Sequence, residues 1–113
     1  MEPIEFTEDE VRYAVVLVTA PSVESAQEIA RALVGDGLAA CVNLVEGVFS
    51  VFKWKGKLEE DKEILLIVKT RTGNLPDLIA RVKELHSYDV PEVIALPVIE
   101  GNPAYLQWID EVT

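Results

Sequence analysis

The stretch VFSVFKWKGKLEEDKEILLIVKTR, residues 48–71, predicts the central feature of this fold, a long β-hairpin. Residues 48–54 are rich in Val and Phe, the side chains that favour a pleated strand. Lys55 and Gly56 follow as the turn. The return strand begins polar over residues 57–62 and becomes fully apolar over residues 64–68, as expected where a strand leaves the solvent and enters a core.

This hairpin is too long for one small domain. If residues 57–71 are all strand, they span roughly 50 Å, whereas a globule of this size has a radius of gyration of about 13 Å. The tip carries Val51, Phe52 and Trp54, which a soluble monomer does not expose in a row. An unpaired edge of this kind pairs with another chain, for example along residues 93–99 of a neighbour. We therefore expect a closed oligomeric ring; the alternative is a hairpin that bends back on its own sheet at Gly47.

The segments around the hairpin predict a strand and helix on each side. Residues 13–18 form a near-continuous apolar run, typical of a buried strand, and Ser22 is suited to cap the helix that follows. Apolar residues recur at helical spacing over residues 26–33 and 78–85. Residues 93–99 form the last strand, where Pro97 requires an edge or a bulge, and Asn102 caps a short terminal helix. The order β-α-β-β-α-β plus a helix predicts an α+β, ferredoxin-like sandwich.

Length and charge restrict the domain organisation and the partners. The chain has 113 residues, so we expect an acidic lead-in over residues 1–12 and one domain over residues 13–113. Asp and Glu total 20 against 10 Lys and Arg, a net charge of -10 that repels nucleic acid and anionic membranes. Cys41 is the only cysteine, which excludes an internal disulfide and a cysteine-rich zinc site. With no apolar signal segment at the start, we expect a soluble cytoplasmic protein.

Six motifs together carry a resemblance to a known family. They are VTAPS (18–22), GLAACVN (37–43), FKWKGKLEEDKE (52–63), LIVKT (66–70), LHSYDVPEVIALPV (85–98) and GNPAYLQWI (101–109). In this order and register they resemble the CutA family of divalent-cation tolerance proteins, from residue 13 to residue 109. The resemblance implies a homotrimer of ferredoxin-like subunits that is implicated in tolerance of copper and other divalent metals. It implies no established enzymatic activity.

His86, the only histidine, is the first candidate metal ligand. Imidazole suits Cu(II), Zn and Ni, and Glu92 or Asp89 would add carboxylate oxygens. The alternative is that His86 only caps the end of the second helix. The resemblance implies that His86 and Glu92 occupy positions associated with metal in the family. Many relatives also carry a cysteine near the end of the first strand; residues 18–20 are VTA here, so a soft ligand for Cu(I) is missing.

The remaining candidate residues indicate a ligand-binding function and not a catalytic one. Cys41 lies in an apolar, strand-like setting, where a buried thiol acts as a small hydrophobic group. Lys69, Thr70 and Tyr88 would line the same cleft as the metal candidates and bind a small anion; alternatively they serve solvation and packing. No nucleophile–base pair and no phosphate-binding glycine loop is present in the sequence. We therefore predict that the protein is not an enzyme.

Three functions remain open from the sequence. The first is a homotrimer that binds or responds to Cu(II) or another divalent cation, with His86 and Glu92 in a cleft between subunits. The second is a trimeric sensor, similar to PII proteins, that binds a small anionic ligand between subunits and depends on Lys69. The third is a rigid trimeric scaffold without a ligand, whose hairpins contact another protein.

Overall fold

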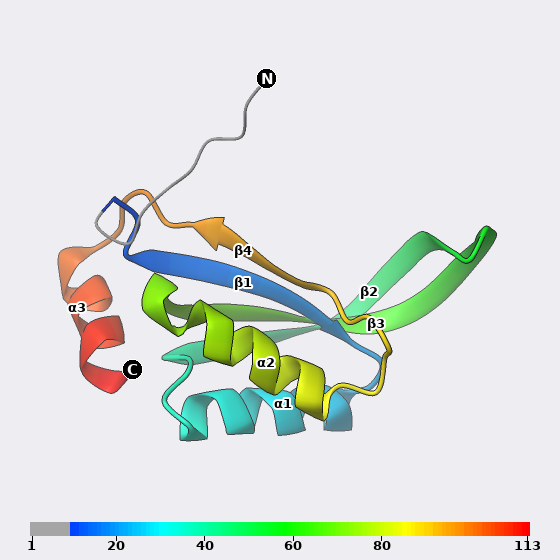
Figure 1. Cartoon of the computed structure of the whole chain (residues 1–113), viewed down its shortest axis with the longest axis horizontal. Helices are drawn as coiled ribbons and strands as arrows, with labels where there is room; N and C mark the ends of the chain where they lie inside the picture. Colours follow the sequence, from blue (N-terminus) through cyan, green and yellow to red (C-terminus); the bar gives the residue numbers. More distant parts are fainter. Residues whose placement is uncertain (1–9) are drawn as a thin grey trace.

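The computed structural model describes residues 10–113, which form a four-stranded antiparallel sheet with helices packed against it (Figure 1). Spatially the strands run β2-β3-β1-β4, which confirms the predicted β-α-β-β-α-β order and its ferredoxin-like arrangement. Along the chain the elements are β1 (Tyr13–Ala20), α1 (Val23–Gly35), β2 (Cys41–Trp54), β3 (Lys57–Arg71), a 3₁₀ turn η1 (Thr72–Asn74), α2 (Leu75–Leu85), β4 (Val93–Pro97) and α3 (Pro103–Val112).

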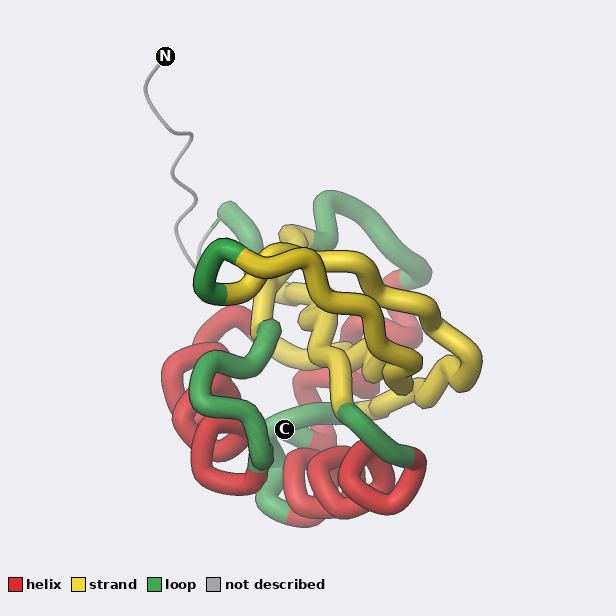
Figure 2. The backbone as a smooth tube through the Cα atoms, turned by 90° about the vertical axis from the view of Figure 1, so that its right-hand side faces the viewer, coloured by secondary structure: helices red, strands yellow, loops and turns green. Residues whose placement is uncertain are grey.

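The core lies between one face of the sheet and helices α1 and α2. Figure 2 shows helices gathered together beneath the strands. Alternate residues of β1 and β3 point to this face, as the two-residue period of a strand requires. The fully buried side chains are Val16 and Val18 from β1, Leu66 and Val68 from β3, Ile29 and Leu33 from α1, and Leu78 and Val82 from α2. The helical spacing of apolar residues therefore predicted most of the core-facing positions of α1 and α2, although Ile79 of α2 is 37% exposed.

The opposite face of the sheet is apolar but less covered. Val15 and Leu17 of β1 and Ile67 of β3 are only partly buried there. Ile94 and Leu96 of the edge strand β4 remain 52% and 49% exposed. The sequence of β1 predicts a strand buried on both faces; within one chain the helices bury only one of them. The second face is thus an apolar surface that one chain leaves partly open.

The hairpin of β2 and β3 extends beyond the body of the sheet, as the sequence predicted (Figure 1). A bulge between Val45 and Val48 changes its direction, and Gly47 adopts a φ of +78° there. The turn at Lys55 and Gly56 has positive φ at both residues, the geometry that suits two-residue hairpin loops. Large apolar side chains are exposed along the hairpin, including Phe49 and Trp54.

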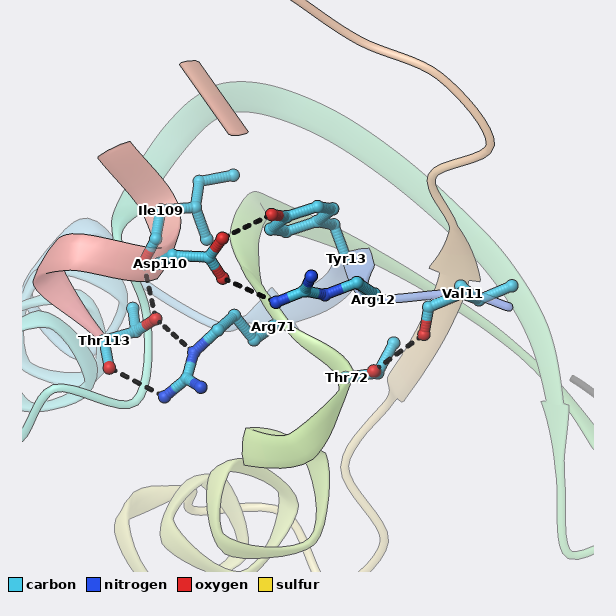
Figure 3. A network of polar contacts seen from close by, with 8 residues as sticks. All are labelled: Val11, Arg12, Tyr13, Arg71, Thr72, Ile109, Asp110 and Thr113. Carbon is cyan, nitrogen blue, oxygen red and sulfur yellow. Dashed lines mark hydrogen bonds and ion pairs between the residues drawn. The ribbon is translucent and has the colours of Figure 1, made fainter. Parts of the chain in front are cut away.

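Helix α3 closes the other end of the sheet through a polar network (Figure 3). The hydroxyl of Tyr13 donates to Oδ2 of Asp110 at 2.5 Å. Arg71 donates from Nε to Oγ1 of Thr113 at 2.9 Å and from Nη2 to the backbone oxygen of Thr113 at 2.7 Å. Ile109 is buried and adds an apolar contact. Asn102 caps α3 through the N–H of Ala104, and Ser22 caps α1 in the same way through that of Ser25, as predicted.

Part of the predicted lead-in, residues 1–9, lies outside the described residues. Val11 and Arg12, also assigned to that lead-in, are bound to the domain. The backbone oxygen of Val11 accepts from the hydroxyl of Thr72 at 2.8 Å, and that of Arg12 accepts from the Thr72 N–H at 2.9 Å. These two residues are therefore joined to the body of the domain through Thr72.

Candidate cation site at the base of the hairpin

A cavity of about 400 Å³ lies where the hairpin leaves the sheet. Three segments that are distant in the sequence form its wall: the end of β1, the middle of the hairpin, and the chain between α2 and β4. Figure 1 shows this last segment passing the hairpin at that point. The lining residues are Thr19 from β1, Ser50, Val51 and Phe52 from β2, Glu63 from β3, and Tyr88, Val90 and Glu92 from the segment before β4. Among these described residues there are two carboxylates and no lysine or arginine.

Glu63 is the most unusual residue of this wall, because it is a carboxylate with only 6% of its surface exposed. Its Oε2 accepts a hydrogen bond from the hydroxyl of Tyr88 at 3.0 Å. None of the ion pairs found within residues 10–113 includes Glu63. A buried carboxylate is costly unless charged or hydrogen-bonding partners compensate it. Glu63 therefore offers strong acceptor capacity to a cation that enters the cavity.

Tyr88 holds Glu63 in place and remains protonated. Burial raises the pKa of Tyr88 to about 12, and the hydrogen bond to Glu63 and the negative charges of Glu63 and Asp61 add to the effect. At neutral pH the phenol is therefore a donor, and it orients one oxygen of Glu63. The other oxygen of Glu63 is free of any hydrogen bond found in the described part of the chain.

His86 lies behind this wall and is buried, with 8% of its surface exposed. The N–H of Tyr88 donates to Nδ1 at 3.1 Å, so the ring proton is assigned to Nε2, which donates to the backbone oxygen of Thr19 at 2.6 Å. The ring also packs against that of Tyr88 in a tilted arrangement, with 4.5 Å between centroids and 46° between the ring planes. Both nitrogens are thus engaged, and His86 connects Thr19 to Tyr88. Its own backbone N–H donates to the backbone oxygen of Val82, which ends α2.

The two predicted metal ligands lie differently with respect to the cavity. Glu92 lies in the cavity wall, whereas His86 contacts two residues of that wall and is not part of it. Within residues 10–113, no cluster of three or more His, Cys, Asp or Glu side chains has the geometry to hold a metal ion. The cavity wall does contain two carboxylates, Glu63 and Glu92, with hydroxyl groups beside them, and oxygen donors are the ligands that hard divalent cations take.

Sequence reasoning missed Glu63 because it lies at the boundary between the polar segment 57–62 and the apolar segment 64–68 and resembles one more charged residue of an exposed strand. The signal that identifies it is its position: Glu63 directly precedes the apolar run that begins at Ile64, so its side chain lies where the strand becomes buried. Thr19 and Ser50 were missed as well, since each occupies an ordinary strand position. Long-range packing alone brings them to the cavity.

The predicted polar set of Lys69, Thr70 and Tyr88 is not brought together. Tyr88 lies at the cavity. Lys69 instead places Nζ 4.0 Å from Sγ of Cys41 on the neighbouring strand. Thr70 is fully buried and donates its hydroxyl to the backbone oxygen of Leu38 at 2.6 Å. Cys41 itself is half-buried, less enclosed than the sequence predicted.

A second, smaller cavity of about 220 Å³ adjoins the first along the hairpin. It shares three wall residues with the first cavity, Phe52, Tyr88 and Val90. Trp54, Asp61 and Asp89 complete its wall. Asp89, another of the predicted ligand residues, thus faces this second cavity.

The fold and the site together define the class of protein: it is an α+β domain with a projecting hairpin and an acidic cavity at the base of that hairpin. The model of the family "CutA1 divalent ion tolerance protein" matches residues 14–112. The chain therefore belongs to the CutA1 divalent ion tolerance protein family, as its motifs suggested.

Individual relatives agree with this assignment. The divalent-cation tolerance protein CutA of Thermus thermophilus is 56% identical over 99 residues, which cover 88% of this chain and 96% of that protein. A solved structure of the protein from this organism has a TM-score of 0.88 and covers 89% of this chain and 98% of that one, at 54% identity. Protein CutA of Mus musculus is 52% identical over 96 residues, 85% of this chain and 54% of that protein, so the chain spans about half its length.

A structure from Archaeoglobus fulgidus, described as a periplasmic divalent cation tolerance protein CutA, has a TM-score of 0.86 at 41% identity. It covers 88% of this chain and 97% of that one. In the described part of this chain, none of the helices has the length and apolar character needed to cross a membrane.

Proposed function

We propose that this protein is a homotrimer without enzymatic activity that binds Cu(II) or another divalent cation at the cavity at the base of the hairpin. Glu63 and Glu92 provide oxygen ligands, and a neighbouring subunit completes the cleft. The buried carboxylate of Glu63, which faces a cavity with no basic residue among its described lining, is the observation that carries this proposal. The net charge of -10 favours the approach of cations, and the relatives' names refer to divalent-cation tolerance. A cytoplasmic location belongs to the same proposal.

His86 enters the proposal in one of two roles. In the first, it positions the cavity wall, because it connects Thr19 to Tyr88, which in turn holds Glu63. In the second, which the sequence predicts, it coordinates the metal together with Glu92. Coordination requires a ring nitrogen to give up its present hydrogen bond, since a ligating nitrogen needs a free lone pair. The positioning role agrees better with the contacts within one chain, because both ring nitrogens of His86 are already hydrogen-bonded there.

Two features support a trimer. The helix-free face of the sheet carries exposed Ile94 and Leu96 beside partly buried Val15 and Leu17, and apolar faces of this kind are normally covered. Strands β2 and β4 are the two edges of the sheet, and each offers unpaired backbone groups to a neighbour. Light scattering after size exclusion is expected to give the mass of three 12.5-kDa chains. A monomer at micromolar concentration would contradict the proposal.

The metal site is tested by titrating Cu(II) calorimetrically into the wild type and into matched amide variants. Glu63→Gln and Glu92→Gln are each expected to weaken binding about tenfold or more, while Glu28→Gln, an exposed change on α1, leaves it unchanged. Equal binding by all four proteins would exclude this cavity. No binding by the wild type would favour the ligand-free scaffold.

The role of His86 is decided by spectroscopy of the bound Cu(II). Nitrogen hyperfine structure in the electron paramagnetic resonance spectrum that disappears in His86→Ala identifies His86 as a ligand. If His86 only positions the wall, the variant binds more weakly and the spectrum of its bound Cu(II) is unchanged.

The anion-sensor alternative has little support from the cavity. Its wall contains Glu63 and Glu92, which repel an anion. Lys69, the residue on which that alternative depends, lies beside Cys41 and outside the wall.

A further inference from the structure

We infer that the cavity at the base of the hairpin binds its cation through oxygen ligands alone, and is therefore a site for hard divalent ions such as Mn²⁺, Ca²⁺ and Mg²⁺ without a special preference for copper. This inference rests on the proposed function, because it names the class of cation that the same cavity binds. It depends on which donor atoms the chain offers. It therefore applies equally to an open cavity and to one that a neighbouring subunit covers.

The side chains of the described cavity wall offer oxygen donors only. Glu63 and Glu92 supply carboxylates. Hydroxyl groups come from Thr19, Ser50 and Tyr88, and the other lining residues are apolar. Tyr88 keeps its proton at neutral pH, because its pKa is raised to about 12, so it is not a phenolate ligand. Oxygen ligands of this kind suit Mg²⁺, Ca²⁺ and Mn²⁺, whereas imidazole and thiolate ligands suit copper and zinc.

The only imidazole of the chain is already engaged. His86 is the one histidine, and only 8% of its surface is exposed. Its Nδ1 accepts from the N–H of Tyr88 at 3.1 Å, and its Nε2 donates to the backbone oxygen of Thr19 at 2.6 Å. A cation that took either nitrogen would leave a backbone group without its hydrogen-bond partner in a buried place, which is costly. The ring therefore supports the wall and is not available as a ligand.

The only thiol of the chain lies away from the cavity. Cys41 is the first residue of β2, whereas the part of β2 in the cavity wall begins at Ser50. An extended strand over residues 41–50 spans roughly 30 Å at about 3.3 Å per residue. Sγ of Cys41 instead lies 4.0 Å from Nζ of Lys69. Met1, the one methionine, is outside the described residues, so no sulfur donor is found in the described wall.

A neighbouring subunit changes the number of donors but not their class. In a homo-oligomer, every surface that approaches the cavity belongs to a copy of the same chain. Each copy has one histidine and one cysteine, which have the contacts described above. Each copy also has 20 Asp and Glu against 10 Lys and Arg, a composition that favours further carboxylate ligands. The donor set is therefore still made of oxygen when the cleft is completed.

A donor set of this kind has a measurable signature, which is a small difference between copper and manganese. Cu(II) binds almost every protein site more tightly than Mn²⁺. With oxygen ligands alone, we expect this advantage to be on the order of a hundredfold. One imidazole or thiolate ligand raises it to on the order of ten-thousandfold or more, because these softer ligands favour copper. The ratio of the two dissociation constants therefore reports the class of ligand.

The test compares the two ions on the full-length protein. Free Mn²⁺ is measured by electron paramagnetic resonance while protein is added, and Ca²⁺, Mg²⁺ and Cu(II) then compete for the bound Mn²⁺. We expect saturable binding of Mn²⁺, its displacement by Ca²⁺, and a dissociation constant for Cu(II) that is lower by no more than about a hundredfold. The spectrum of the bound Cu(II) is expected to show no nitrogen hyperfine structure.

Variants assign the bound ion to the cavity. Glu63→Gln and Glu92→Gln are each expected to weaken Mn²⁺ binding about tenfold or more, whereas Cys41→Ala and Glu28→Gln leave it unchanged. A ten-thousandfold preference for Cu(II), or nitrogen hyperfine structure in its spectrum, would overturn the inference and leave the proposed divalent-cation binding intact. Wild-type Mn²⁺ affinity in both glutamine variants would overturn the inference and the proposed site together, as would the absence of binding by every ion.

Discussion

The two ends of the sheet each contain a phenol that donates to a carboxylate, and the two pairs serve different purposes. At the α3 end, Tyr13 donates to Asp110, and the guanidinium of Arg12 lies 3.9 Å from the second carboxylate oxygen (Figure 3). At the hairpin end, Tyr88 donates to Glu63, and none of the ion pairs among residues 10–113 supplies a cation there. A carboxylate compensated within the chain stabilises the fold, whereas one left without a cation is available to a ligand.

The largest expected effect tests whether stability is concentrated at the closed end. Ile109→Ala removes a side chain only 3% exposed beneath α3 and is expected to lower the free energy of unfolding by about 3 kcal/mol. Leu58→Ala, on the hairpin, removes a side chain that is 69% exposed and is expected to cost less than about 0.5 kcal/mol. Urea denaturation at one fixed protein concentration measures both. Comparable losses would mean that the hairpin is also a packed region, as it would be in a tight assembly.

Matched amide substitutions test the two phenol–carboxylate pairs directly. Asp110→Asn keeps an acceptor for Tyr13 but removes the attraction to Arg12, so we expect a loss of about 1 kcal/mol. Glu63→Gln also keeps an acceptor for Tyr88 and removes a buried charge without a cation. In metal-free buffer we expect it to leave stability unchanged or to raise it by up to about 1 kcal/mol. The reverse order of these two effects would contradict the comparison.

Sequence patterns predicted the local features of both ends because those features depend on residues close together in the chain. The turn at Lys55 and Gly56 and the Ser22 cap each follow from a few neighbouring residues. Pro97 was expected at an edge or a bulge, since a proline has no N–H to donate within a sheet, and it lies on the edge strand β4.

The site was harder to predict because its contacts are long-range. Glu63 and Tyr88 are 25 positions apart, and Tyr13 and Asp110 are 97 apart, so no local pattern reveals either pair. The sequence predicted His86, the only histidine, as a metal ligand. In the structure, Nε2 of His86 donates to the backbone oxygen of Thr19, 67 positions away. Backbone acceptors are the same for every residue type, so the sequence contained no sign of this partner.

A glycine substitution tests the bend at which the hairpin departs from the sheet. Gly47 has a φ of +78°, and no atom lies within 4 Å of an added Cβ, so the cost of Gly47→Ala is conformational and is expected to be about 1 kcal/mol. Gly35→Ala is the control, because Gly35 ends α1 without a positive φ and has the same open space. We expect it to be neutral or slightly stabilising in thermal or urea denaturation. Equal effects would show that the bulge is not a conformational constraint.

The smallest expected effect is a difference in how the two phenols titrate. The pKa of Tyr13 is raised mainly by its hydrogen bond to Asp110, while that of Tyr88 is raised to about 12 mainly by burial. Asp110→Asn should therefore bring the pKa of Tyr13 back toward its ordinary value of about 10, whereas Glu63→Gln should lower that of Tyr88 only in part. NMR titration of the tyrosine ring carbons in metal-free buffer resolves the two residues.

The same pKa shifts contribute to the dependence of stability on pH in alkaline solution. A folded-state pKa above the unfolded value of about 10 means that the folded protein holds the proton more tightly. The resulting stability is complete below about pH 10 and is lost as the pH rises toward about 12 for Tyr88. Tyr88→Phe should remove this part of the alkaline loss, because a phenylalanine has no proton to release. An unchanged dependence of stability on pH between about 10 and 12 would show that the buried phenol at the hairpin end does not contribute to it.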